Sequence, residues 1–378
     1  MLKVVHIISD IDHGGAQKII INYLQDLQYD KKIKLYLLVL GPKINHEYNK
    51  IIEKCNVEVT YLDSFINLSI PWFFKRIAEK IIINKRVNKY LKAINPEIVH
   101  IHLYGTLFLT INSIHKCRIP LKFYTLHSDP LRFNNYKLKV LKDSFSKFGV
   151  IPICVTEEQA IVAKKHYGFK RYEIVHNGVD FKNIKSRIIS QNEARKLFGL
   201  EKNDFVISAV GRLTPIKRYD LLIKIFSKVM SILPDAKLLI AGSGNELDKL
   251  KELANSLGLA NSVLFLGEIK NTVELYCASN VVAITSESES ASLVLLEAQA
   301  CGIKCVISDG TPTESIITNK VIKMRKDASI DEWASEIING NNYSKNKYSF
   351  KDYDEYLMSA KIKEIYLKYW EAYKNDKE

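Results

Sequence analysis

Two carboxylates, Glu289 and Glu297, stand eight residues apart in the second half of the chain. The apolar run Val281 to Ile284 leads directly into them, and an apolar helix is expected to carry the second. In an open α/β sheet, ligands bind outside the carboxyl ends of the strands, so Glu289 is expected at that edge. A carboxylate accepts several hydrogen bonds and therefore suits the vicinal hydroxyls of a ribose or a hexose.

Two cations follow a different strand. Arg212 and Lys217 come just after the apolar run Phe205–Val210 and the turn residue Gly211. Two cations on such a loop can neutralise a diphosphate, with Arg as a planar fork and Lys as a point charge. Considered alone, the two would more often be surface charges. The segment Gly242-Ser243-Gly244 closes the next strand, and it is either an ordinary turn or a place where a nucleotide lies close to the backbone.

The first half offers a glycine pair and a histidine. Gly14 and Gly15 lie between the first expected strand and the first helix, and the pattern fits an anion site at a helix N-terminus as well as a tight turn. It is not G-x-G-x-x-G, so dinucleotide binding has little support. His127 follows the expected strand Lys122–Leu126, and Asp129, two residues further on, is the alternative candidate for a functional side chain at this strand end. Strand-end placement favours a functional histidine.

The elements that position these groups alternate between strands and helices, which predicts parallel sheets built from βαβ units. A chain of 378 residues is too long for one ordinary core, so two domains are expected. The polar stretch Asp180–Asn203 divides them, and Tyr353–Tyr373 is expected to form a final helix. The expected strands are Val4–Ser9, Leu35–Leu40, Val57–Leu62, Ile98–His102, Lys122–Leu126, Ile151–Val155, Phe205–Val210, Lys237–Ala241, Val263–Leu266, Val281–Ile284 and Lys304–Ser308.

Composition excludes several classes of protein. Hydrophobic residues make up 47% and charged residues 26%, as in ordinary globular proteins. The six cysteines form neither a disulfide framework nor a zinc pattern, which indicates reduced thiols in a cytoplasm. No signal peptide is expected. The run Ile98 to His115 lacks charged residues, but its histidines, Asn112 and Gly105 favour strand, turn and helix over a membrane span.

The positive charge is confined to one half. Residues 1–185 contain 29 Lys and Arg against 16 Asp and Glu, which accounts for the whole net charge of +13. Much of it lies in 72–92, where basic residues and recurring apolar residues follow aromatics. This segment is either an amphipathic helix on an anionic membrane or a core-packed helix with a solvated basic face. No nucleic-acid-binding motif is present, so nucleic acid is not expected as a partner.

Taken in order, these motifs resemble the retaining GT-B glycosyltransferases of family 4, over nearly the whole chain. The matching segments are Gly14-Gly15-Ala16-Gln17, His176-Asn177-Gly178-Val179-Asp180, Gly211-Arg212-Leu213 with Lys217, Gly242-Ser243-Gly244, and Glu289 with Glu297 followed by Ala298-Gln299-Ala300-Cys301-Gly302.

The resemblance implies an α/β fold of two Rossmann-like domains that face each other across a cleft. Residues 1–184, joined by the returning helix 353–378, would bind the acceptor, and 185–352 would bind a nucleotide-sugar. Arg212 and Lys217 would hold the diphosphate. Glu297 would bind the ribose and His127 the acceptor side. Glu289, Ser290, Ala291, Ser292 and Leu293 would address the donor sugar, with Gly14, Gly15, Gly211 and Gly242 lining the donor site. No metal and no cofactor would be required.

One departure concerns the turn after the first glutamate, where the family usually has glycine and this chain has Ser290-Ala291-Ser292. The expected function is transfer of a sugar, with retention, from a UDP-sugar to a lipid-linked or saccharide acceptor. Capsule, exopolysaccharide or lipopolysaccharide assembly on the inner face of the cell membrane would be the setting. A GT-B sugar-nucleotide epimerase and a non-catalytic GT-B partner subunit are the alternatives.

Overall fold

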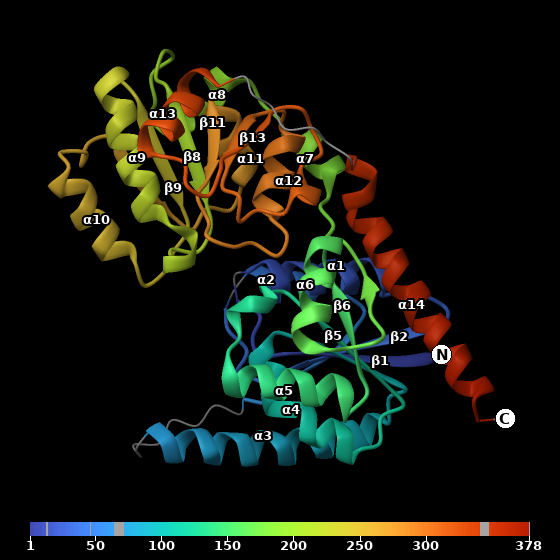
Figure 1. The fold of residues 1–378 in the computed structure, drawn as a ribbon. Coiled ribbons are helices and arrows are strands. Elements are labelled where there is room, and N and C mark those ends of the chain that lie inside the picture. The colour runs from blue at the N-terminus through green and yellow to red at the C-terminus, as the bar shows by residue number, and fades with distance from the viewer. Residues whose placement is uncertain (13, 46, 64–71, 341–347, 378) are drawn as a thin grey trace. The chain divides into compact units, whose positions relative to one another are not determined.

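The computed structural model describes residues 1–12, 14–45, 47–63, 72–340 and 348–377. His13, which the sequence places in the first turn, lies outside them, as do the side chains of 72–77 and 135. The chain forms two compact units (Figure 1). Unit 1 comprises Met1–Gly178 and Glu355–Glu378, and unit 2 comprises Val179–Asp354. Among the described residues, no helix is both long and apolar enough to cross a membrane.

Unit 1 contains a seven-stranded parallel sheet in the order β3-β2-β1-β4-β5-β6-β7. The order reverses between β1 and β4, because the chain builds outward first on one side of β1 and then on the other. The strands are β1 (Leu2–Ile8), β2 (Ile33–Val39), β3 (Glu58–Tyr61), β4 (Ile98–His102), β5 (Leu121–Thr125), β6 (Val150–Cys154) and β7 (Glu173–Ile174). The helices are α1 (Gly15–Leu27), α2 (Glu47–Ile52), α3 (Trp72–Ile94), α4 (Tyr104–Lys116), α5 (Asn135–Ser146), α6 (Glu157–Tyr167) and α14 (Glu355–Asn375).

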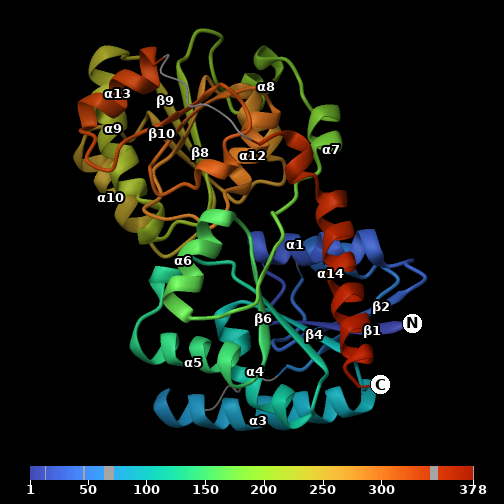
Figure 2. The ribbon, with the colours of Figure 1, turned by 45° about the vertical axis from the view of Figure 1, so that its right-hand side comes forward.

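The two faces of this sheet are covered by different helices, as Figures 1 and 2 show. Val5 and Ile7 of β1 pack into the core with α3, α4, α5 and α6. His6 between them points to the opposite face, where its ring contacts Tyr23 of α1 and Tyr366 of α14. Alternate residues of a strand face opposite sides, so His6 lies on the face opposite to Val5 and Ile7.

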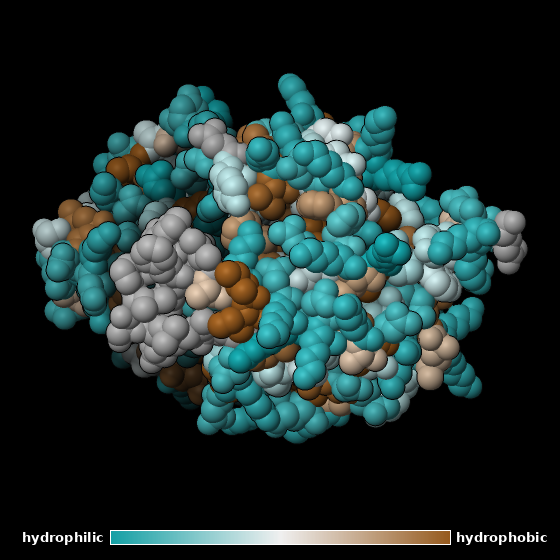
Figure 3. Space-filling view, turned by 90° about the horizontal axis from the view of Figure 1, so that it is seen from below, coloured by the Kyte–Doolittle hydropathy of each residue, from teal (hydrophilic) through white to brown (hydrophobic). Residues whose placement is uncertain are grey.

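Helix α3 is packed on the core and exposes a basic face, which is the second of the two interpretations that the sequence left open; its binding to a membrane stays a prediction. Ile83, Val87 and Leu91 are buried one turn apart in the core, which fixes the helix to unit 1. The other side is exposed and carries Lys85, Lys89 and Lys92. In the view from below, where α3 lies nearest the viewer, most of the surface is hydrophilic, with small hydrophobic areas between (Figure 3).

Unit 2 repeats the architecture with six parallel strands in the order β10-β9-β8-β11-β12-β13. Helices α9, α10 and α13 cover one face, and α7, α8, α11 and α12 the other. The strands are β8 (Val206–Val210), β9 (Lys237–Ala241), β10 (Val263–Gly267), β11 (Val281–Ile284), β12 (Lys304–Ile307) and β13 (Val321–Lys323). The helices are α7 (Phe181–Ser186), α8 (Gln191–Leu197), α9 (Tyr219–Ile232), α10 (Leu247–Ser256), α11 (Thr272–Ala278), α12 (Leu293–Ala300) and α13 (Ile330–Asn339).

The unit boundary falls six residues before the predicted end of the first domain at 184. The polar stretch Asp180–Asn203 is not a bare linker, because it contains α7 and α8. Phe181 and Ile184 of α7 are buried with Leu296 of α12 and therefore belong to unit 2. The short strands β7 and β13 were also missed, since two or three residues give too little pattern to recognise.

Candidate active site

The cations and carboxylates predicted from sequence meet at one edge of the sheet in unit 2. β8 and β11 are neighbouring parallel strands, and the strand order reverses between them. Arg212 and Lys217 follow β8, and Glu289 follows β11. In doubly wound sheets, ligands bind at the carboxyl ends of the two strands where the order reverses. The structure therefore places these three residues where such a sheet has its crevice.

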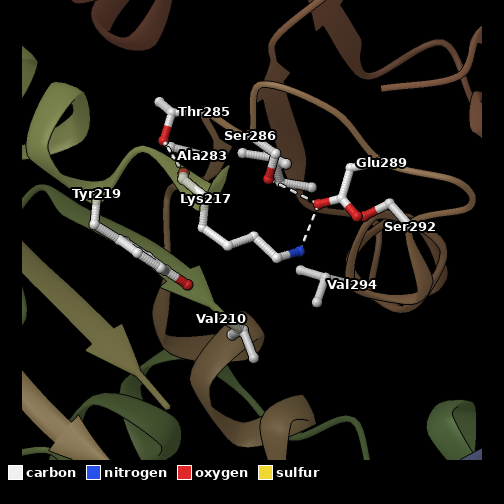
Figure 4. A pocket seen from close by; sticks show the side chains of 10 residues that line it. Val210, Lys217, Tyr219, Ala283, Thr285, Ser286, Glu289, Ser292 and Val294 are labelled. Atoms are coloured by element: carbon white, nitrogen blue, oxygen red, sulfur yellow. Dashed lines mark hydrogen bonds and ion pairs between the residues drawn. The ribbon is translucent and has the colours of Figure 1, made fainter. Parts of the chain in front are cut away.

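Lys217 and Glu289 form an ion pair inside a small pocket. Lys217 Nζ lies 2.6 Å from Glu289 Oε1, and the two side chains are 24% and 11% exposed. The Ser286 hydroxyl donates to the same carboxylate oxygen at 2.8 Å. Figure 4 shows the amine and the carboxylate pointing toward one another, with Tyr219 beside the lysine. The Arg212 side chain is exposed on the same loop. In this state the pocket presents a lysine neutralised by a carboxylate.

The loops that carry the pair are bonded to each other. The Thr285 hydroxyl donates to the Lys217 carbonyl at 3.0 Å, and the Glu287 amide donates to the Ile216 carbonyl at 2.8 Å. Since these bonds join the loop after β8 to the loop after β11, the lysine and the glutamate are held in fixed register. Thr285 and Ser286 are buried, and their hydroxyls are hydrogen-bonded, as buried polar groups usually are.

A third loop, after β12, supports Glu289 from the other side. The Glu289 amide donates to the Gly310 carbonyl at 2.9 Å. A Cβ on Gly310 would stand 2.1 Å from the Glu287 carbonyl oxygen, so only glycine permits this close approach. Sequence reasoning did not identify Gly310, although its position in the loop after β12 was a signal.

The turn in which the sequence departs from the family that it resembles does not require glycine. Ser290, Ala291 and Ser292 are absent from the described non-glycine residues with positive φ, so the turn does not need glycine for its own conformation. Ser292 caps α12 by accepting a hydrogen bond from the Leu295 amide at 3.4 Å. Leu293 is the first residue of that helix. The turn therefore connects Glu289, which lines the pocket, to a capped N-terminus of α12.

Glu297 lies on α12 and is held by two residues that sequence reasoning missed. Its Oε2 accepts hydrogen bonds from the Tyr276 hydroxyl at 3.0 Å and from the Thr272 hydroxyl at 3.3 Å. Both donors belong to α11. Burial raises the pKa of Tyr276 well above its ordinary value, and the nearby Glu297 charge raises it further. Tyr276 therefore stays protonated and serves as a donor that orients the carboxylate.

The segment Gly242-Ser243-Gly244 is fixed by packing between loops. A Cβ on Gly242 would stand 2.0 Å from the Gly211 carbonyl oxygen, and φ of Gly242 is +139°. The Leu213 amide donates to the Ser243 carbonyl at 2.7 Å, which joins the same two loops. The glycines are therefore required for backbone packing. That a nucleotide also approaches Gly242 stays a prediction.

In unit 1, the glycine pair opens α1. Gly14 is the N-cap and Gly15 the first helical residue, and no side chain of a described residue caps this end. Beside it, Gln17 donates to Asp10 Oδ1 at 2.9 Å, which connects the helix to the loop after β1. Gly14 and Gly15 follow β1, one of the two strands between which the strand order of unit 1 reverses. That they contact the donor stays a prediction.

His127 lies just after β5 and is partly exposed. Its Nε2 is 3.1 Å from Nδ1 of His102, the last residue of β4. Burial lowers the pKa of His127 to about 4, so it is neutral near pH 7. Asp129, the alternative for the same task, caps the short turn Pro130–Arg132 by accepting from the Leu131 amide at 2.9 Å. That bond gives Asp129 a local structural role.

Comparison with known families fits this geometry. The family described as Glycosyl transferases group 1 matches residues 190–364, and Glycosyltransferase Family 4 matches residues 14–183. Together the two matches cover most of both units. The chain belongs to the glycosyltransferases of family 4. Most of the first match lies on unit 2, and most of the second lies on unit 1.

Curated relatives resemble part of this glycosyltransferase. D-inositol 3-phosphate glycosyltransferase from Mycolicibacterium smegmatis is 38% identical over 157 residues, which are 40% of this chain and 35% of that protein. N-acetyl-alpha-D-glucosaminyl L-malate synthase from Bacillus anthracis is 33% identical over 137 residues, which are 36% and 35% of the two chains. The chain thus spans about a third of the length of the curated relatives it matches.

Solved structures resemble nearly the whole glycosyltransferase. HepE from Anabaena, in complex with UDP-glucose, has a TM-score of 0.76 at 19% identity, over 97% of this chain and 100% of that chain. Sucrose-phosphate synthase from Thermosynechococcus elongatus has a TM-score of 0.76 at 15% identity, over 98% and 100%. At such identities the likeness concerns the fold, and it confirms the predicted α/β, GT-B class of two Rossmann-like domains.

Proposed function

We propose that this family 4 glycosyltransferase moves a sugar, with retention of anomeric configuration, from a UDP-sugar to a lipid-linked or saccharide acceptor. Assembly of a capsule, exopolysaccharide or lipopolysaccharide is the proposed setting. The observation that carries the proposal is the Lys217–Glu289 pair, 2.6 Å apart where the strand order of unit 2 reverses. HepE, which shares the fold, was solved with UDP-glucose.

The pair suggests how the donor would be recognised. A diphosphate carries more negative charge than one carboxylate. It would therefore displace Glu289 from Lys217 and bind both Lys217 and Arg212. Glu289 would then accept hydrogen bonds from the hydroxyls of the donor sugar. Cations fixed by bonded loops stabilise the charge that develops on the leaving diphosphate without reorganising during the reaction.

Glu297 would bind the ribose. Tyr276 and Thr272 orient its carboxylate through Oε2, and each carboxylate oxygen can accept up to two hydrogen bonds. Ribose hydroxyls would add to this set. On the acceptor side we assign His127, at the carboxyl end of β5. The departing phosphate would take the proton of the acceptor hydroxyl.

The test is nucleotide release from a panel of UDP-, GDP-, ADP- and dTDP-sugars, with and without lipid-linked and soluble saccharide acceptors. We expect acceptor-dependent release from one UDP-sugar and a product with the anomeric configuration of the donor, as read by proton NMR. A variant carrying both Arg212→Ala and Lys217→Ala is the control. Release by this variant at the wild-type rate, or conversion of the UDP-sugar to its epimer, would contradict the proposal.

We also propose that α3 holds unit 1 on the inner face of an anionic membrane. Its exposed side carries Lys85, Lys89 and Lys92, together with Ile81, which is 64% exposed. Each basic residue near an anionic surface contributes about 1 kcal/mol, and salt screens this attraction. Arg86 is a poorer contributor, because it donates to the carbonyls of Leu62 and Asp63.

Membrane binding can be tested with a charge-matched pair of variants. Lys85, Lys89 and Lys92 are replaced by Gln in the first variant. Three exposed lysines of unit 2 are replaced by Gln in the second, namely Lys202, Lys251 and Lys326. We expect only the first variant to lose binding to vesicles containing phosphatidylglycerol, with nucleotide release unchanged in both. If both variants lost vesicle binding equally, the binding would depend on the net charge of the protein and not on α3.

A further inference from the structure

Three histidines of unit 1 form a continuous hydrogen-bonded chain that runs into the core. His127 Nε2 lies 3.1 Å from His102 Nδ1, and His102 Nε2 lies 3.0 Å from His6 Nδ1. His6 and His102 are fully buried, and His127 is the partly exposed end. At the inner end, His6 Nε2 is buried and has no hydrogen-bond partner.

All three imidazoles are neutral near pH 7. Burial lowers the pKa of His6 to about 3 and that of His127 to about 4. The pKa of His102 is well below its ordinary value, through burial and through the neighbouring histidines. A neutral imidazole carries one N–H and one lone pair. Two N···N hydrogen bonds in series therefore allow only two arrangements of the protons, with every N–H pointing outward or every N–H pointing inward.

The inner end distinguishes the two arrangements. With every N–H pointing inward, His6 carries its proton on Nε2, where a buried N–H has no acceptor. With every N–H pointing outward, His6 Nε2 is a bare lone pair. Buried N–H groups without an acceptor are rarer in proteins than incompletely satisfied acceptors, which favours the outward arrangement.

We propose that His102 and His6 are positioning residues that hold His127 as the Nδ1–H tautomer. The Nε2 lone pair of His127 then accepts from His102, and Nδ1–H is the group left to bind substrate. On the proposed function, His127 is a hydrogen-bond donor to an oxygen of the sugar or the acceptor, not a base that removes a proton. The hydrogen bond made by one imidazole nitrogen sets the role of the other.

One neighbouring imidazole, His100, does not belong to the hydrogen-bonded histidine chain. His100 stacks on His102 with ring centroids 4.2 Å apart, but its own nitrogens bond to Tyr366 and Thr125. His6, His100 and His102 also lie close enough to hold a metal ion. In the hydrogen-bonded chain the facing nitrogens of His6 and His102 share a proton, which a metal would displace. Metal binding is therefore a result that would overturn the proposal.

The direct test needs no substrate. Long-range ¹H–¹⁵N correlation spectra of the ¹⁵N-histidine-labelled full chain report the tautomer of each imidazole. Assignment comes from single His→Gln variants. We expect the Nδ1–H tautomer for His127, His102 and His6 at pH 7. An Nε2–H or charged His127 at that pH, or stoichiometric zinc in the purified protein by elemental analysis, would overturn the proposal.

A kinetic test separates positioning from packing. Asn can place its amide N–H near the position of imidazole Nδ1, so His102→Asn keeps a donor to His127 and His102→Leu removes it. We expect His102→Leu to lower kcat by roughly tenfold or more with the donor KM unchanged, and His102→Asn to restore most of it. His100→Gln is the control, and its kcat should stay at the wild-type value. Equal kcat in the two folded His102 variants would contradict positioning.

The two tests also separate this inference from the proposed function. If the tautomers are as proposed but His127→Ala transfers sugar at the wild-type rate, the histidine chain stands and the acceptor role of His127 fails. If His127 carries its proton on Nε2, the inference fails whatever the activity of the variants.

Discussion

The two units share a topology but fill the edge where their strand order reverses with different chemistry. Unit 2 uses charge, because Lys217 and Glu289 form an ion pair in a partly exposed pocket. Unit 1 instead has buried, neutral histidines, His6 on β1 and His102 on β4, and the strand order of its sheet reverses between these two strands. All nine histidines of the chain precede residue 179, so unit 2 has none. The same topology thus carries an ion-paired pocket in unit 2 and a hydrogen-bonded chain of neutral histidines in unit 1.

The largest expected effect comes from removing the charges of unit 2. Arg212→Ala and Lys217→Ala should each lower kcat about 10²-fold or more, since fixed cations stabilise the leaving diphosphate in the transition state. Steady-state nucleotide release measures this. Glu289→Gln combined with Lys217→Ala controls for the unpaired carboxylate that the single lysine variant leaves behind. Near-normal turnover in both single variants would remove the charged site from the comparison.

Glu297→Gln should weaken donor binding more than it slows the reaction. Hydrogen bonds to a charged group contribute about 1.5–3 kcal/mol, and ribose contacts exist in both the ground and transition states. The loss should therefore appear in KM with little change in kcat. Titration calorimetry with UDP gives the affinity separately. Unchanged affinity with abolished turnover would assign Glu297 to the chemical step.

Acid should destabilise unit 1 before unit 2. Burial lowers the pKa of His6 from 6.5 to about 3. Between these two pH values the unfolded state binds a proton on His6 and the folded state does not. Stability is thus fully present above pH 6.5 and falls as the pH drops toward 3. His6 alone accounts for about 2 kcal/mol at pH 5.

The two units can be followed separately in urea titrations at pH 7 and pH 5. Trp370 of α14 reports unit 1 and Trp333 of α13 reports unit 2, each in a variant with the other tryptophans replaced by Phe. The non-titrating variant His6→Gln should lose less stability between the two pH values. Parallel loss in both units, unaffected by His6→Gln, would break the comparison.

The smallest expected effect is that of Tyr276→Phe. The variant keeps the ring and removes one hydrogen bond to Glu297, whose net contribution is about 1 kcal/mol. UDP affinity should fall by about fivefold, with the thermal midpoint nearly unchanged. A loss as large as that of Glu297→Gln would mean that the tyrosine itself contacts the nucleotide.

Sequence alone placed the charged groups well, and the reason is topological. Arg212, Lys217 and Glu289 each lie in a loop that follows an apolar strand, and neighbouring parallel strands end at one edge of the sheet. The 2.6 Å contact between Lys217 and Glu289 could not be predicted, because it depends on β8 and β11 being neighbours although 70 residues of chain separate them. Pattern reveals strand ends, but pairing order comes from the fold.

Two groups escaped sequence reasoning for a related reason. Tyr276 has the pattern of a core residue, and only the packing of α11 against α12 brings its hydroxyl to Glu297. His6 and His102 interrupt apolar strands, but His102 was used only as evidence against a membrane span and His6 was not used at all. Their contact joins positions 96 residues apart. Gly242 was recognised as special, but the packing that requires glycine there is visible only when the neighbouring loop is in place.

Unit 1 is assembled from two stretches of chain with all of unit 2 between them. Helix α14 supplies the Tyr366 hydroxyl to buried His100, and Lys363 pairs with Asp30 at the end of α1. During translation, unit 2 is complete once residue 354 has left the ribosome, whereas unit 1 still lacks this helix. Unit 2 can thus reach its native state first, which reverses the usual order of synthesis and folding. Until α14 emerges, the histidine face of the first sheet is covered by α1 but lacks its contacts with Tyr366.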